Sequence, residues 1–378
     1  MSSYLTLNDV SVDGLRVLVR SDLNVPLDDG VITDDFRIRS ALPTLERLVA
    51  AGARVSVCSH LGRPSGEDPS LTLRPVAEHM SGLTELSVGF EEEAEITVLE
   101  NTRFDAGETR NDSETAARMA GSYDLFVQDA FGSVHRAHAS TAGVAKILRS
   151  VAGPLLDKEL TAFGRFLDAT PRPYTVVLGG AKVSDKLKVI ENLLPKVDRM
   201  LIGGAMCFTF LAARGMSIGD SLVEEEMVET VSDLLHGPHG PRLILPVDIV
   251  VGDRFAEDAD REVVLASEIR EGTIGLDIGP ESGAGFWELI ESSKSVFWNG
   301  PMGVFEWESF RNGTDTVARA MAACDGFTAV GGGDSAAALR LLGLDRSVSH
   351  LSTGGGAGLE LLEGRILPGV EVLGRWVP

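Results

Sequence analysis

The sequence predicts an α/β protein of two lobes, each a doubly wound, Rossmann-like parallel sheet, with a connector helix between them. Short β-branched runs alternate with segments that carry apolar residues at helical spacing, and this alternation is typical of parallel sheets covered by helices. The pattern occurs twice, on either side of a proline-rich break at residues 170–173. A chain of 378 residues is also long for a single core. We therefore expect residues 1–152 and 171–364 to form the two lobes and residues 153–170 to form the connector.

The composition is that of a globular protein with a strongly acidic surface. Hydrophobic residues make up 44% of the chain, and the mean hydropathy is +0.09. The formal net charge of −22 argues against binding to nucleic acid or to anionic membranes, since both would repel it. Only seven of the 34 lysines and arginines are lysines. This pattern is typical of proteins kept soluble in concentrated salt, although ordinary acidic enzymes also exist.

Cysteine usage and the N-terminus indicate a cytoplasmic protein. Cys58, Cys207 and Cys324 lie far apart and form no CxxC pair, which argues against a disulfide framework or a metal knuckle. The first residues lack the pattern of a signal peptide. The longest apolar run, 200–213, is too short to span a bilayer. If the acidic surface reflects salt adaptation, that cytoplasm is rich in salt.

Four strands are predicted in the first half, and each is followed by a polar exit loop. A helix capped by Thr33 or Asp34 and ending at Gly52 lies between the first two strands. The strands are 15–20, 54–58, 95–99 and 123–127, and their exit loops are 21–26, 59–64, 100–104 and 129–138. Ligands of such sheets bind beyond the carboxyl ends of the strands.

Cationic side chains gather in and around these exit loops. They are Arg20, Arg37, Arg39, His60, Arg63, Arg103, His135, Arg136 and His138. Any one of these arginines, taken alone, is more often a solvated surface charge. Several of them at strand exits, in so acidic a chain, indicate a pocket for a small polyanion, because guanidinium groups match carboxylate and phosphate geometry.

The second half opens on a strand, a glycine turn and a helix, with lysines at the turn. The strand is 174–178, the turn is GGAKVSDK (179–186) and the helix is 187–194. Glycines allow a close backbone approach, and a helix start exposes N–H groups that attract anions. No GxxxxGK[ST] motif is present, which excludes a P-loop. On this stretch alone, a solvated helix start is as good an interpretation as a phosphate site.

The later strand exits are rich in glycine rather than arginine. Strands are predicted at 199–202, 243–248, 296–298 and 327–330, and glycine clusters at 203–205, 299–303, 331–335 and 354–358. Small residues there suit backbone contacts with a nucleotide. Asp334 fits either a Mg²⁺ ligand aided by phosphate oxygens or a plain N-cap. The acidic runs 91–93 and 224–226 are expected to be solvated faces.

Nine segments of the chain resemble the phosphoglycerate kinase family, and together they cover nearly its whole length. They are RSDLNVP (20–26), SHLGRP (59–64), LENTRF (99–104), DAFGSVHRAHAS (129–140), GGAKVSDK (179–186), LDIGPES (276–282), WNGPMGVFEWE (298–308), GGGDS (331–335) and STGGGAGLELLEG (352–364). The resemblance implies reversible phosphoryl transfer from 1,3-bisphosphoglycerate to ADP, giving 3-phosphoglycerate and ATP, as in glycolysis and gluconeogenesis. It also implies a monomer, direct in-line transfer after closure about the connector, and a C-terminal segment, 365–378, that returns to the first lobe.

The resemblance also assigns roles by matching motifs. The triose phosphate would be bound on the first lobe by Asp22, Leu23, Asn24, Arg37, His60, Leu61, Gly62, Arg63, Arg103 and Arg136. The nucleotide would be bound on the second lobe by Lys186, Gly275, Asn299, Glu306, Gly332, Gly333, Asp334 and Ser335. Arg37, Lys182 and Lys186 would act in the transfer. Asp334 would hold Mg²⁺, which arrives as MgADP or MgATP.

Three positions depart from the family pattern, and two other functions stay open. Leu23 replaces a usual phenylalanine, Ala205 a glycine and Ser335 a threonine, but none of these changes removes a chemical group. One alternative is another acyl-phosphate kinase, and the other is a non-catalytic polyanion-binding protein. The presence of Arg37, Lys186 and Asp334 together argues against the latter.

Overall fold

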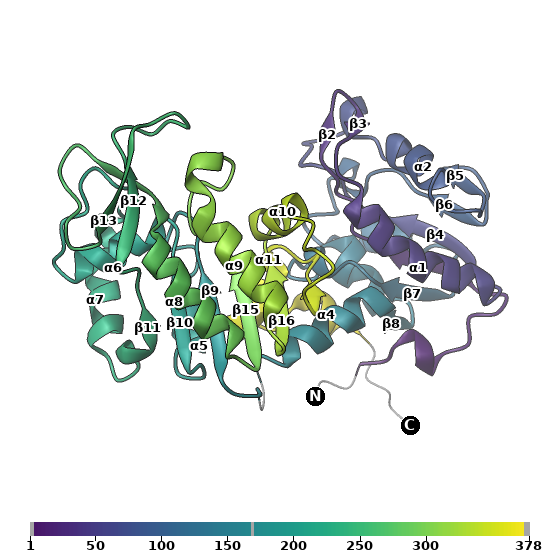
Figure 1. Ribbon diagram of the computed structural model, residues 1–378. Coiled ribbons are helices and arrows are strands. Elements are labelled where there is room, and N and C mark those ends of the chain that lie inside the picture. Colours follow the sequence, from purple (N-terminus) through teal and green to yellow (C-terminus); the bar gives the residue numbers. More distant parts are fainter. Residues whose placement is uncertain (1–3, 168–169, 374–378) are drawn as a thin grey trace. The chain divides into compact units, whose positions relative to one another are not determined.

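The computed structural model describes residues 4–167 and 170–373 and divides into two compact units (Figure 1). The first unit consists of Met1–Thr161 and Arg365–Pro378, and the second of Ala162–Gly364. The predicted connector, 153–170, is thus shared between them, and its residues 168 and 169 lie outside the described ones. The expected return of segment 365–378 falls in the first unit, although residues 374–378 are not described.

A six-stranded parallel sheet forms the centre of the first unit. Its strand order is β5-β6-β4-β1-β7-β8, and every neighbouring pair is parallel. The strands are β1 (Arg16–Arg20), β4 (Arg54–Cys58), β5 (Val88–Phe90), β6 (Ile96–Val98), β7 (Leu125–Gln128) and β8 (Ser150–Ala152). The central strand β1 is buried on both faces, as parallel strands are. Val17 and Val19 pack into one core cluster and Leu18 into another.

Helices cover this sheet, and a small hairpin follows its first strand. The helices are α1 (Phe36–Ala50), α2 (Arg74–Ser81), α3 (Ser113–Ala120) and, near the C-terminus, α12 (Pro368–Glu371). The predicted cap at Thr33 or Asp34 was wrong, because the N-cap of α1 is Asp35, whose side chain makes no capping bond. The Asp34 carboxylate accepts from the N–H of Phe36 at 2.9 Å. The hairpin of β2 (Leu27–Asp28) and β3 (Val31–Ile32) was not expected. The helix α4 (Pro154–Gly164) contains the boundary between the two units.

The second unit has its own six-stranded parallel sheet, in the order β11-β10-β9-β15-β16-β17. The strands are β9 (Tyr174–Leu178), β10 (Arg199–Ile202), β11 (Leu243–Ile244), β15 (Ser295–Asn299), β16 (Phe327–Gly331) and β17 (His350–Leu351). The helices are α5 (Leu187–Leu193), α6 (Met206–Ala213), α7 (Val228–His236), α8 (Pro280–Glu291), α9 (Asn312–Ala323), α10 (Gly333–Leu341) and α11 (Gly356–Leu362). The predicted fold class of two parallel α/β lobes is confirmed.

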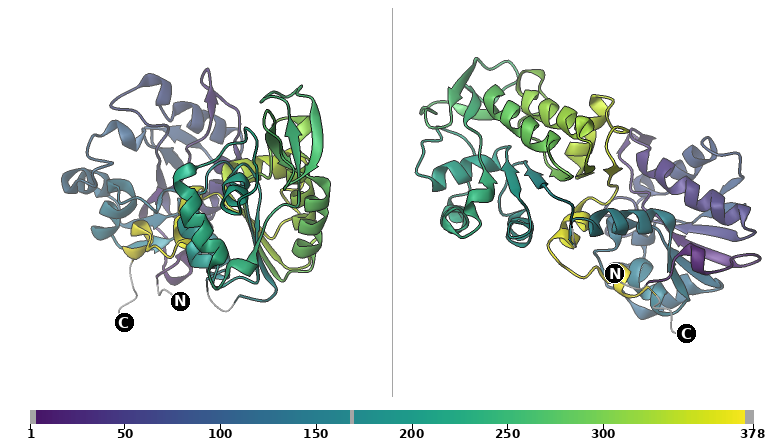
Figure 2. Two further views of the ribbon diagram at one scale, coloured as in Figure 1. Left: turned by 90° about the vertical axis from the view of Figure 1, so that its left-hand side faces the viewer. Right: turned by 60° about the horizontal axis from the view of Figure 1, so that its bottom comes forward.

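An additional antiparallel sheet of the second unit was missed by the sequence analysis. It has the order β13-β12-β14, with β12 (Asp248–Gly252), β13 (Arg261–Leu265) and β14 (Ile274–Ile278), and β12 and β13 form the long green ribbon of Figures 1 and 2. The predicted strand 243–248 was therefore wrong as a single element. Its start belongs to β11 and its end to β12, in different sheets. Pro246 lies between them and lacks the N–H that a continuous strand needs.

Among the described residues, every helix is too short or too polar to cross a membrane.

Candidate functional site

Cations of the first unit lie close enough to influence one another. Burial lowers the pKa of His60 well below its usual value, and Arg20, Arg103 and Arg37 lower it further. Burial likewise lowers the pKa of Arg103, with Arg136, Arg20 and Arg63 adding to the effect. These groups come from the exits of β1, β4, β6 and β7 and from α1. The structure thus brings the predicted anion-binding cations together.

Arg39 is not part of this cluster. Its guanidinium pairs with Asp35, one helical turn earlier, at 2.9 Å, and its side chain is mostly exposed. His138 does belong, since burial and the charges of Arg103 and Arg20 lower its pKa to about 4.

A buried arginine fixes the orientation of His60. Arg20 is only 1% exposed, and its guanidinium lies 2.9 Å from the Ser140 hydroxyl and 3.0 Å from Nδ1 of His60. Because arginine can only donate, Nδ1 must accept and the ring proton must sit on Nε2. The fully buried carboxylate of Glu108 accepts from the N–H and the hydroxyl of Ser140 at 2.9 and 2.5 Å. His60 is therefore a neutral donor held by an Arg20–Ser140–Glu108 network.

Asp22 ties the first exit loop to helix α1, and Asn24 ties it to the second exit loop. The Asp22 carboxylate pairs with Arg37 at 2.7 Å, and the Asn24 side chain accepts from the N–H of Gly62 at 2.8 Å. Gly62 has φ of +63°, and a Cβ on it would lie 2.8 Å from the Leu71 side chain, so this tight turn requires glycine.

The remaining predicted residues of this unit differ in what they can offer a ligand. Leu23 and Leu61 are buried in the apolar core, and both main-chain groups of Leu61 bond to Asn101. Arg63 is exposed, whereas Arg103 donates to the carbonyl of Gly62. Arg136 donates to the ring of His135 at 3.0 Å. The three arginines can therefore offer positive charge to a ligand. The two leucines support the loops by packing into the core.

A cavity of about 530 Å³ lies in the second unit, between the antiparallel sheet and the glycine exits of the parallel sheet. Phe208, Leu276, Val304 and Trp307 give it apolar walls. Gly275, Glu306 and Asp334, three of the predicted nucleotide residues, line it. These walls suit a flat, apolar ring system.

Gly275 is required by the shape of this cavity. A Cβ on this residue would lie 2.0 Å from the Phe208 ring, far inside van der Waals contact. Its N–H is bonded to the Ser221 hydroxyl at 2.9 Å, which holds β14 in place. The tip of the phenyl ring therefore packs directly against the main chain of β14.

Lys186 is buried beside the cavity, and within the described part of the chain no carboxylate is in hydrogen-bond contact with its ammonium. It is 8% exposed, and its ammonium donates to the carbonyls of Gly179 and Asn299 at 2.5 and 2.7 Å. Burial lowers its pKa to about 7, against the smaller opposing effects of Asp334 and Asp185. Lys182, by contrast, is exposed. The ammonium of Lys186 is thus a poorly solvated cation that an incoming anion would stabilise.

The exits of β15 and β16 complete this region. The fully buried Ser335 hydroxyl accepts from the N–H of Gly300 at 2.6 Å, and the Asn299 amide donates to the Gly331 carbonyl at 2.8 Å. Gly332 has φ of +93° and precedes α10, whose first residues, Gly333 and Asp334, are exposed. Two glycine turns are thereby held next to each other.

The turn 182–186 differs from the expectation of free N–H groups. The Glu224 carboxylate accepts from the N–H groups of Val183 and Ser184, at 2.5 and 3.1 Å. The prediction of a solvated acidic run was wrong for Glu224, which is buried, whereas Glu225 and Glu226 are exposed. These N–H groups are therefore already bonded within the protein and are not available to an anion. An anion bound at this turn would interact with the lysine side chains.

Among the described residues, no three His, Cys, Asp or Glu side chains are grouped as a metal site. Asp334 contributes a single exposed carboxylate at the cavity. A hard oxygen ligand of this kind suits Mg²⁺ whose other ligands are phosphate oxygens and water.

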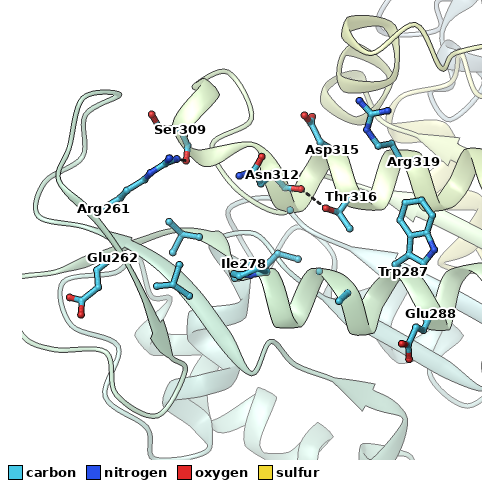
Figure 3. A pocket seen from close by; sticks show the side chains of 17 residues that line it. Arg261, Glu262, Ile278, Trp287, Glu288, Ser309, Asn312, Asp315, Thr316 and Arg319 are labelled. Carbon is cyan, nitrogen blue, oxygen red and sulfur yellow. Dashed lines mark hydrogen bonds between the residues drawn. The ribbon is translucent and has the colours of Figure 1, made fainter.

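A second, larger cavity of about 960 Å³ lies between the antiparallel sheet and helices α8 and α9 (Figure 3). The Arg261 guanidinium lies at one end of this cavity and donates a hydrogen bond to the Ser309 carbonyl at 2.8 Å. Trp287 and Arg319 line the other end. None of the predicted site residues lines it.

Comparison with known proteins identifies the family. The family described as phosphoglycerate kinase matches residues 7–365. A phosphoglycerate kinase of Salinispora arenicola is 53% identical, over 97% of this chain and 98% of its own, and one of Rubrobacter xylanophilus is 51% identical, over 97% of each. The solved phosphoglycerate kinase of Coxiella burnetii is 41% identical, covers 98% of both chains and superposes with a TM-score of 0.90. The chain therefore belongs to the phosphoglycerate kinase family.

Proposed function

We propose that the chain transfers a phosphoryl group reversibly between 1,3-bisphosphoglycerate and ADP, by direct in-line displacement, with the two substrates held on different units. The family is one of phosphotransferases with a carboxyl acceptor. The observation that carries the residue roles is the contrast between the two sites. One is a cluster of guanidinium groups, and the other is a glycine- and apolar-walled cavity with a buried lysine beside it.

The first unit supplies the site for the three-carbon acid. Arg37, Arg63, Arg103 and Arg136 would meet its phosphate and carboxylate, because guanidinium forks pair with both groups. Neutral His60 would donate its Nε2–H to one of these oxygens. Asp22 and Asn24 would accept from the hydroxyl of the glycerate, in addition to their bonds to Arg37 and Gly62. Leu23, Leu61 and Gly62 would shape the loops.

The second unit supplies the nucleotide site. The base would lie against Gly275 and Phe208, and Glu306 would accept from the ribose hydroxyls at the rim of the cavity. The phosphates would follow the turns at Asn299 and Gly332 towards the exposed start of α10 at Gly333, with buried Ser335 holding those turns together. Asp334 would hold Mg²⁺ carried in by the nucleotide, and the bound ion would neutralise phosphate charge.

The transfer needs charge stabilisation more than proton chemistry. Phosphoryl transfer passes through a loose transition state whose charge spreads over the equatorial oxygens. Lys186 and Arg37 would stabilise this charge, and Lys182 would contact the nucleotide phosphates. The attacking carboxylate is already ionised, so no general base is required.

We also propose that both ligands together draw the units towards each other about residues 153–170, which excludes water from the transfer. Small-angle scattering should then show a smaller radius of gyration with 3-phosphoglycerate and a nucleotide together than with either alone. An unchanged profile would contradict this closure.

A coupled assay of 3-phosphoglycerate and MgATP tests the function, with acetate and other carboxylates as competing acceptors. Turnover confined to 3-phosphoglycerate supports the proposal. Turnover of acetate in its place would favour another acyl-phosphate kinase, and binding without turnover by folded protein would favour a polyanion-binding protein. Sedimentation of the active protein checks the proposed monomer.

A further inference from the structure

Glu224 is the buried member of an otherwise exposed acidic run. It is 8% exposed, and its carboxylate lies against the turn that carries Lys182 and Lys186. One carboxylate oxygen accepts from the N–H groups of Val183 and Ser184, and the other accepts from the Ser184 hydroxyl at 2.5 Å. Burial opposes the charge of this group, but the bonds from Ser184 and Val183 outweigh it and leave the pKa of Glu224 below its usual value. A single carboxylate therefore serves three donors of one short turn.

Glu224 is itself held by a buried helix. Its main-chain N–H donates to the hydroxyl of Thr209 at 3.1 Å, and Thr209 lies in α6 with 1% exposure. On the other side, the N–H of Lys186 donates to the carbonyl of Val183 at 2.9 Å. Hydrogen bonds therefore run without a break from α6 through Glu224 and Val183 to the main chain of Lys186.

We propose that Glu224 is a positioning residue that fixes the turn 182–186, so that the ammonium of Lys186 stays between the carbonyls of Gly179 and Asn299. The proposal rests on the role given to Lys186 in phosphoryl transfer. A carboxylate suits this task because it only accepts. A glutamine would still accept from the two N–H groups through its Oε1, but its N–H₂ would donate to the Ser184 hydroxyl, so three charge-assisted hydrogen bonds would become weaker neutral ones. A displaced Lys186 would meet the transferring group in the wrong place, and misplacement by about 1 Å costs up to ~100-fold in rate.

Glu224→Gln tests the proposal, with Glu225→Gln and Glu226→Gln as matched controls from the same run. We expect Glu224→Gln to lower kcat about tenfold, because the hydrogen bonds that hold the turn lose their charged acceptor and become weaker. Because the proposed acceptor site lies in the other unit, KM for 3-phosphoglycerate should not change. Ser184→Ala, which removes one donor and leaves both N–H groups paired, should lower kcat by a smaller factor. The controls should match the parent protein.

A double-mutant cycle with Lys186→Ala separates positioning from a general loss of structure. If Glu224 acts through Lys186, adding Glu224→Gln to Lys186→Ala should change kcat less than about twofold. A full tenfold loss in that background, or an unchanged kcat in Glu224→Gln alone, would overturn the proposal. Normal activity of Lys186→Ala would instead refute the proposed role of Lys186. If Glu224→Gln fails to fold, Ser184→Ala can be introduced instead into the parent protein and into Lys186→Ala. Additive losses of kcat in that second cycle would also overturn the proposal.

Discussion

Replacing Lys186 with methionine should make the ligand-free protein more stable and at the same time nearly inactive. The buried ammonium has a pKa of about 7, against 10.5 for an ordinary lysine. At about 1.4 kcal/mol for each tenfold change, this difference corresponds to a penalty on the order of 5 kcal/mol for keeping the charge buried. Methionine removes that penalty but leaves the Gly179 carbonyl without its donor, which costs about 1–3 kcal/mol. We therefore expect a net gain in the free energy of unfolding of roughly 2–4 kcal/mol at pH 7 and below.

The stability gain should depend on pH with a definite sign. Below pH 7 the lysine is charged in both the folded and the unfolded protein, so the penalty is fully present. Between pH 7 and 10.5 the folded protein releases the proton and the unfolded chain keeps it, so the penalty is relieved as the pH rises. The advantage of Lys186→Met should thus shrink by about 1.4 kcal/mol for each pH unit above 7. Urea unfolding of both proteins at pH 6.5, 8 and 9 measures this difference.

Activity should change in the opposite direction. Removing a cation beside a transferring phosphoryl group typically costs about 10³-fold in kcat. The exposed Lys188, two residues further on, provides the control, because Lys188→Met should alter neither stability nor kcat. Activity of Lys186→Met within tenfold of the parent would refute the catalytic argument. A stability difference that does not vary with pH would refute the argument that Lys186 is desolvated.

Three further predictions concern the two sites and the surface. Gly275→Ala forces the Phe208 ring to move, so KM for MgATP should rise about tenfold and stability should fall by about 1–3 kcal/mol, whereas an unchanged KM would show that the base binds elsewhere. Arg20→Lys cannot donate to Ser140 and His60 together, so KM for 3-phosphoglycerate should rise about tenfold with KM for MgATP unaffected, and equal effects on both would point to misfolding. With a net charge of −22, activity should rise from low salt to several molar KCl, and activity confined to low salt would exclude a salt-adapted surface.

The sequence predicted the parallel sheets well because their signal is local. Buried strands such as Tyr174–Leu178 are continuous β-branched or aromatic runs, and each is followed by a polar or glycine-rich exit. The antiparallel sheet was missed because β13 and β14 lack such runs, and because the predicted strand 243–248 stopped short of the run Ile249–Val251 in β12. β13 is largely exposed and contains charged residues, and β14 is interrupted by Gly275. The antiparallel pairing of β14 with β12 depends on tertiary packing, which no local pattern reports.

Residue type alone was enough to select the candidate site residues at the strand exits, and their roles stay a prediction. The arginines of the first unit and the glycine turns of the second lie at the expected strand exits. The supporting contacts could not be predicted, since they depend on long-range packing. Glu224 is indistinguishable from Glu225 in the sequence, yet only Glu224 meets the turn 182–186. Likewise, nothing near Glu108 indicates that it lies buried against Ser140.

The cavity lined by Phe208 and Gly275 has a consequence for how this protein can vary. Its walls are largely main chain, glycine and apolar side chains, so its outline depends little on which charged groups cover the exterior. The acidic surface can therefore change without altering the cavity. Lys186 is different, because its ammonium fits between two carbonyls and a Cβ on the neighbouring Gly300 would lie 2.5 Å from it. A branched guanidinium has no room there. Lysine can therefore be exchanged for arginine on the exterior but not at position 186.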